Sequence, residues 1–138
     1  MHENEISRQI IGAAIEVHRY FGPGLVEQVY EEALCHEFHL RGILFKRQQS
    51  VPIRYKDVQL GSNLYLDLVV YDKVIVDNKA KEAILPIDKS KLLTYLRLTG
   101  LRLGLLINFH DDTLKSGIQR VVNGLADACL PAPGSFTL

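Results

Sequence analysis

Two aspartates and a lysine within one stretch of alternating sequence are the residues of this chain best suited to chemistry. Asp67, Asp77 and Lys79 all lie in residues 64–79, LYLDLVVYDKVIVDNK. Carboxylate oxygens are the ligands that Mg²⁺ prefers, and a divalent cation polarises a phosphoryl group and lowers the pKa of its bound water. A lysine beside such a centre orients the water or stabilises developing charge. The alternative is that these are ordinary charged residues on a solvent-facing pair of strands.

The spacing of the apolar residues predicts how the two aspartates meet. Residues 64–70 alternate with period two, as in a strand, and a second alternating run follows a short turn. With residues 71–73 as the loop, Asp67 faces Asp77 directly, with Cβ atoms roughly 4.5–5.5 Å apart. A two-residue turn would instead send the aspartates to opposite faces. The parity of the apolar side chains favours the first register, which leaves Asn78 on the buried face.

Two predicted helices carry further polar side chains at helical spacing. Glu27 and Tyr30 lie three residues apart and share one helix face, while Lys91 and Tyr95 lie four apart on another. An ammonium group and a phenol on one face suit contact with a phosphate backbone. Taken alone, each pair is more typical of an ordinary amphipathic or solvated helix face. The sequence has no glycine-rich phosphate loop, nucleophile elbow or zinc-ligand spacing.

Length and composition set the broad class of the protein. The chain has 138 residues, of which 47% are apolar and 23% charged, which predicts one folded domain with an ordinary core. The formal net charge is zero, so binding of nucleic acid must rely on the basic segments at residues 41–56 and 79–102. Cys35 and Cys129 lack metal-ligand spacing, and no apolar run is long enough to span a bilayer. We therefore expect reduced thiols and a cytoplasmic protein that does not engage a membrane.

The elements that position these side chains follow from periodicity and from residues that begin or end helices. We expect helices at residues 4–20, 25–40 and 86–99, an edge or bent strand at 43–55, the hairpin described above, and a buried strand at 102–109. Residues 113–124 fit either a short helix or a strand, and the tail from residue 130 is expected to be flexible. This order predicts an α/β fold in which a mixed β-sheet is flanked by helices.

Three motifs, taken together, resemble the GxxExxY protein family of the PD-(D/E)XK nuclease superfamily. They are GPGLVEQVYEEAL, LDLVVYDKVIVDNKA and LLTYLRLTGLRLGLLINF, and the likeness covers roughly residues 5–124. The resemblance implies a single nuclease-like domain over residues 1–138, with a mixed four-stranded sheet flanked by helices at its core. It also implies Mg²⁺ or Mn²⁺ as cofactor and nucleic acid as substrate.

The resemblance assigns roles residue by residue. Asp67 and Asp77 take the places of the superfamily's two acidic residues, and Lys79 takes that of its lysine. Glu27 and Tyr30 match the motif that names the family, and a helix glutamate joins the metal site in many superfamily members. The expected metal ligands are Asp67, Asp77 and Glu27, which with Lys79 form the expected catalytic set. The expected contacts to nucleic acid are Lys91, Tyr95 and Tyr30.

The chain departs from the family pattern at the centre of this site. Family members usually carry Glu-Leu-Lys where this chain has Asp77, Asn78 and Lys79. The shorter carboxylate lies about one methylene further back, and an unpaired amide at Asn78 would cost about 1–3 kcal/mol in the core. Two functions are therefore considered: a metal-dependent nuclease, and a catalytically weak or inactive nuclease-fold module that binds nucleic acid or protein. DNA is expected ahead of RNA, and a homodimer is a further alternative.

Overall fold

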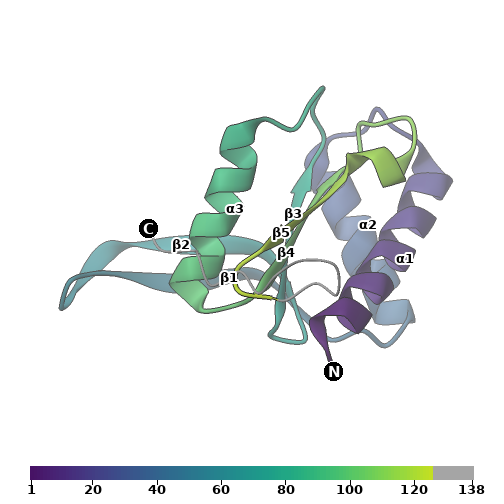
Figure 1. Ribbon diagram of the computed structural model, residues 1–138. Coiled ribbons are helices and arrows are strands. Elements are labelled where there is room, and N and C mark those ends of the chain that lie inside the picture. Colours follow the sequence, from purple (N-terminus) through teal and green to yellow (C-terminus); the bar gives the residue numbers. More distant parts are fainter. Residues whose placement is uncertain (126–138) are drawn as a thin grey trace.

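Helices cover both faces of one mixed β-sheet in the computed structural model, which describes residues 1–125 (Figure 1). The elements are α1 (Glu3–Phe21), α2 (Glu27–Leu40), β1 (Phe45–Tyr55), β2 (Val58–Val70), β3 (Val74–Lys79), α3 (Pro86–Thr99), β4 (Leu103–Asn108), the 3₁₀ turn η1 (Leu114–Gly117) and β5 (Ile118–Val122). The tail predicted to be flexible lies outside the described residues. No helix of the described range is long and apolar enough to cross a bilayer.

The described strands form one five-stranded sheet in the order β1-β2-β3-β4-β5. The pair β3 and β4 is parallel, and the other neighbouring pairs are antiparallel. The α/β class and the mixed sheet are therefore as the sequence predicts. The sheet has one strand more than the four that the resemblance implies, because the second half of the undecided segment at residues 113–124 pairs with β4.

Each face of the sheet has its own apolar core. On one face α1 and α2 pack against side chains of β2, β3 and β4. On the other face α3 covers a smaller core through Leu92 and Leu96, which are fully buried. Helical spacing also predicts Ile87 and Leu98 on the buried stripe of α3, but both are exposed, and Leu92 and Leu96 are its buried apolar residues. The same reasoning predicts that Val26 points inward, but it is exposed as the N-terminal cap residue of α2.

The hairpin of β2 and β3 has the register that the sequence favours. Leu68 pairs with Val76 and Val70 pairs with Val74, which leaves residues 71–73 as the loop. Pairing between the two strands ends at Leu68, although β2 continues with β1 and β3 continues with β4. The β1–β2 ribbon thus leaves the sheet and extends past α3 (Figure 1).

The ribbon bends where Asp67 lies. Gln48 stands opposite Asp67 with a φ of 51°, a left-handed conformation that a glutamine adopts at a cost, and no pair forms between the two. Beyond this bend Leu66 packs into the core under α3, whereas Leu68 packs into the core under α1 and α2. The regular alternation predicted for residues 64–70 is therefore wrong at Asp67. Leu66 and Leu68, which it places on one face, pack into the cores on opposite faces of the sheet.

Asn78 lies on the buried face of β3, as the register predicts. The residue is fully buried, and within residues 1–125 neither its Oδ1 nor its Nδ2 has a hydrogen-bond partner. An amide removed from water without a partner costs about 1–3 kcal/mol. The buried side chain of Asn78 is therefore unfavourable for the stability of the fold.

We expect Asn78→Leu to raise the free energy of unfolding by about 1–3 kcal/mol, because it replaces an unpaired amide with an apolar group that branches at the same atom. Urea unfolding followed by circular dichroism measures the change. The matched control is Asn63→Leu, at an exposed position of the ribbon, which should change stability by less than about 0.5 kcal/mol. An Asn78→Leu protein no more stable than the wild type would contradict the expectation.

Candidate functional site

A cavity of ≈140 Å³ brings together most of the residues predicted to form the site. Asp77 and Lys79 reach it from β3, Asp67 from the bend of β2, and Glu27 from the first residue of α2. The full lining is Glu27, Tyr65, Leu66, Asp67, Ile75, Val76, Asp77, Lys79, Lys91 and Tyr95. Segments far apart in the chain therefore meet at one polar recess.

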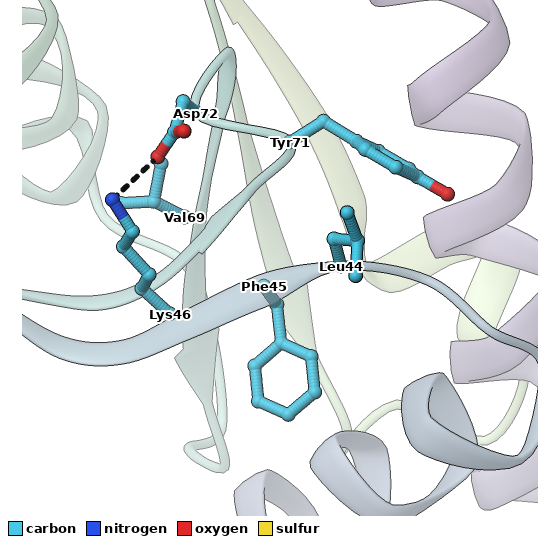
Figure 2. Close-up of a pocket in the computed structure, with 6 residues that line it drawn as sticks. All are labelled: Leu44, Phe45, Lys46, Val69, Tyr71 and Asp72. Carbon is cyan, nitrogen blue, oxygen red and sulfur yellow. Dashed lines mark ion pairs between the residues drawn. The ribbon is translucent and has the colours of Figure 1, made fainter.

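A second cavity, of ≈290 Å³, lies at the start of β1 and contains none of the predicted site residues (Figure 2). Its lining is largely apolar, and its charged groups are Lys46 and Asp72, whose Nζ and Oδ1 atoms form an ion pair at 3.0 Å. Both of these side chains are largely exposed. Because this hollow offers one solvated ion pair and no further charged group, the smaller recess is the candidate site.

Asp67 is fixed at the point where β2 parts from β3. Its Oδ2 accepts a hydrogen bond from the backbone N–H of Asn78 at 3.1 Å. In a regular antiparallel ladder a backbone carbonyl of β2 would accept from β3, but backbone pairing has already ended at Leu68. The carboxylate replaces that carbonyl, and it lines the same recess as Asp77, whose charge acts on it. The predicted meeting of the two aspartates is therefore present.

Burial and mutual repulsion raise the pKa values of the carboxyl groups of the site. Burial, followed by the charge of Asp77, raises the pKa of Asp67 to about 7. Burial also raises the pKa of Asp77, with Lys79 acting in the opposite direction. Burial and then the charge of Asp67 raise the pKa of Glu27. Shifts of this kind gather at functional sites, and a cation would relieve all of them at once.

Lys79 is the basic group of the site. Its Nζ lies 3.4 Å from Oδ1 of Asp77, and the two side chains are 24% and 14% exposed. Burial acts to lower the pKa of Lys79, but Asp77 and Glu27 more than offset it, so the pKa is raised and the ammonium group stays charged. The lysine predicted two residues after Asp77 thus shares its recess.

The donor set fits a hard divalent cation. Asp67 and Asp77 supply adjacent carboxylate oxygens, and Mg²⁺ is usually held by one or two carboxylates together with water and phosphate oxygens. Within the described residues no three His, Cys, Asp or Glu side chains stand close enough to hold an ion together. Glu27 therefore lines the recess but does not complete a three-carboxylate cluster with the aspartate pair.

Tyr30 does not reach the surface, so the predicted contact between Tyr30 and nucleic acid is wrong. The ring is fully buried and stacks on Phe109 with centroids 4.6 Å apart. Its hydroxyl donates to the carbonyl of Gly22 at 2.5 Å and accepts from the N–H of Leu25 at 3.1 Å. Tyr30 instead anchors the segment that leads into α2 and thereby positions Glu27.

Two side chains near the site were not identified from the sequence. Tyr65 lines the recess and is 60% exposed, and its position two residues before Asp67 could have revealed it. Arg47 lines an adjoining cavity of ≈330 Å³ that shares Glu27 and Asp67 with the recess. Its Nε donates to Oε2 of Glu31 at 2.7 Å, a contact between β1 and α2 that no sequence spacing reveals.

A mixed sheet between helices, with two acids and a lysine where adjoining strands part, is the arrangement of a nuclease-like core. Residues 4–121 match the PD-(D/E)XK nuclease superfamily, and the chain belongs to this superfamily. Its nucleases generally use divalent metal ions, and their substrate is nucleic acid. No curated protein and no solved structure matches the chain.

In the absence of divalent metal, we expect Asp67→Asn to raise the free energy of unfolding at pH 8 more than at pH 5. Because the pKa of Asp67 is raised to about 7, the folded protein keeps a proton that the unfolded chain releases near pH 4. The stability of the wild type therefore falls as the pH rises from about 4 to about 7, and asparagine removes this loss. Urea unfolding in EDTA at the two pH values measures the effect.

The control is Asp57→Asn, in the exposed turn at the tip of the ribbon, which should keep the pH dependence of the wild type. If the stability of Asp67→Asn changes with pH as that of the wild type does, the pKa of Asp67 is not raised by its burial.

Proposed function

We propose that this protein hydrolyses phosphodiester bonds in nucleic acid with Mg²⁺ or Mn²⁺ as cofactor. The observation that carries the proposal is the buried pair of Asp67 and Asp77 with Lys79 in the same recess. A solvent-facing strand pair, the alternative raised by the sequence, does not fit an Asp77 side chain that is only 14% exposed. Two buried carboxyl groups with raised pKa values are costly to keep unless a cation uses them.

Each residue of the site has a proposed role. Asp67 and Asp77 would hold the cation through their carboxylate oxygens once both groups are deprotonated. When bound, the cation polarises the phosphoryl group and lowers the pKa of its water. Lys79, held against Asp77, orients that water or stabilises charge on the phosphate. Glu27 hydrogen-bonds the water shell from the α2 side of the recess.

The rim of the recess supplies the proposed contacts to the substrate. Lys91 and Tyr95 lie one helical turn apart on α3, and both line the cavity. The ammonium group of Lys91 suits a phosphate, and the phenol of Tyr95 suits a phosphate or a base. We propose DNA ahead of RNA as the substrate. A homodimer would be needed only for cutting both strands of a duplex.

We also propose that the chain belongs to the GxxExxY group within the superfamily and forms one domain over residues 1–138. The motif residues each have a structural reason in this chain. Gly24 has a φ of 112°, which glycine tolerates best, Glu27 lines the recess, and Tyr30 anchors the start of α2. The cytoplasm is the proposed compartment, in keeping with Cys35 as a free thiol.

A second candidate function is a catalytically weak or inactive module that binds nucleic acid or protein. The observation that favours it is the limited donor set, because Glu27 does not form a three-carboxylate cluster with the aspartate pair among the described residues. The Asp77 side chain is also shorter than the glutamate usual in the GxxExxY family.

We expect the purified protein to cleave a labelled oligonucleotide in Mg²⁺ or Mn²⁺, and Asp77→Asn or Lys79→Met to lower the rate at least about 100-fold. Loss of a ligand or of a charge aimed at the transition state is the physical reason. Gel analysis of time courses measures the rates, and Asp57→Asn should cleave within about twofold of the wild type. Equal cleavage by the wild type and Asp77→Asn would exclude this site as its source.

Calorimetric titration separates the two candidate functions. For the nuclease, Mg²⁺ or Mn²⁺ binds at pH 8, and the affinity falls as the pH drops below about 7, because Asp67 must lose its proton. Asp67→Asn should remove most of the heat of binding. A wild-type protein that binds neither ion at pH 8 favours the second candidate.

A further inference from the structure

Two tyrosines border the recess: the ring of Tyr65 is largely exposed, and that of Tyr95 is half-buried against the core under α3. Tyr65 comes from β2 and Tyr95 from α3, and both line the cavity with Asp67 and Asp77. Throughout the part of the chain that the structure describes, neither ring stacks on another aromatic ring. Their hydroxyls likewise have no hydrogen-bond partner there, in contrast to the buried Tyr30. Both phenol groups are thus available to a ligand.

Tyr65 presents an exposed aromatic ring at the edge of the recess. Its neighbours Leu64 and Leu66 pack into the core under α3, while the Tyr65 ring stays 60% exposed at the edge of the recess. A large aromatic face beside a buried polar site offers a surface on which a flat, apolar group gains stability by stacking. Bases of nucleic acid are groups of this kind, and every base has such a face.

The position of the two rings favours one form of nucleic acid. Asp77 and Lys79 are 14% and 24% exposed in a cavity of ≈140 Å³, and Tyr65 and Tyr95 line the same cavity. The bases next to a phosphodiester held there would therefore lie beside the rings. In a duplex the faces of these bases are already stacked on their neighbours, whereas an unpaired strand can turn its bases onto aromatic side chains.

Lys91 adds a cation beside the rings. It lies one turn before Tyr95 on α3, is exposed, and has no ion-pair partner within residues 1–125. A positive groove that follows the backbone, combined with rings on which successive bases stack, is how proteins bind single strands. The recess thus has the charge and the aromatic surfaces that such a ligand requires.

We propose that this site takes an unpaired nucleic-acid strand, with Tyr65 and Tyr95 stacking on the bases next to the phosphodiester held at Asp67 and Asp77. The inference rests on the proposed function, since it names the substrate class of the same site. It assigns to Tyr65 a role in positioning the substrate, and it makes the unpaired state of the strand, rather than its base sequence, the property that is recognised.

The test is fluorescence anisotropy of the full-length protein with a labelled 12-nucleotide DNA, as a single strand and as the matching duplex. Ca²⁺ replaces Mg²⁺, because it takes the same oxygen ligands but sits in a looser geometry. We expect the single strand to bind at least about 10-fold more tightly than the duplex. Tyr65→Leu should weaken single-strand binding at least about 5-fold, the effect of one lost stacking contact.

Two matched variants control this experiment. Tyr65→Phe keeps the ring and should bind within about twofold of the wild type. If the hydroxyl made the contact, this variant would bind more weakly. Tyr55→Leu removes a ring with 63% exposure on the same ribbon, outside the recess, and should also bind within about twofold. Thermal unfolding of each variant shows whether the fold is retained.

Preferred duplex binding, absence of single-strand binding, or equal binding by Tyr65→Leu and the wild type would each overturn the proposal. A parallel cleavage assay in Mn²⁺ separates it from the proposed activity. Binding that depends on Tyr65 without any cleavage would support the stacking site and contradict the nuclease. Equal cleavage of duplex and single strand by both the wild type and Tyr65→Leu would support the nuclease and contradict the stacking site.

Discussion

The hydrogen bond from the backbone N–H of Asn78 to the Asp67 carboxylate is the contact on which the arrangement of the site depends. It joins β2 and β3 at the point where their backbones have stopped pairing. The Asp67 side chain thus accepts the hydrogen bond that a backbone carbonyl would accept in a continuous ladder. Asp77 and Lys79 lie beside Asp67 where the two strands separate. The recess therefore begins where the pairing of the strands ends.

The same region concentrates the unfavourable features of the fold. Buried carboxyl groups repel one another, Gln48 takes a left-handed conformation opposite Asp67, and the Asn78 side chain has no partner within the described residues. Proteins that otherwise follow the rules of local structure break them where function requires it. Backbone strain at Gln48, repulsion between carboxyl groups and the unpaired side chain of Asn78 all lie on the strand segments next to Asp67, which indicates that this region is not optimised for stability.

The sequence predicted the framework well because the signals were local or periodic. The hairpin register followed from the parity of its apolar residues, and Pro86 and Gly100 marked the ends of α3. The errors concern contacts between elements. Nothing in the helical spacing of Tyr30 says that its hydroxyl will bridge Gly22 and Leu25. The bend at Gln48 was equally hidden, because a glutamine with positive φ leaves no mark in the sequence.

The outer part of the β1–β2 ribbon stands clear of the rest of the sheet (Figure 1). Asp67 lies at the base of this ribbon, where the pairing of β2 with β3 has ended. Asp77 is held by a backbone ladder, the parallel pairing of β3 with β4, whereas Asp67 is joined to β3 by one hydrogen bond from its side chain. A force on the outer ribbon therefore reaches the site through Asp67 and not through Asp77.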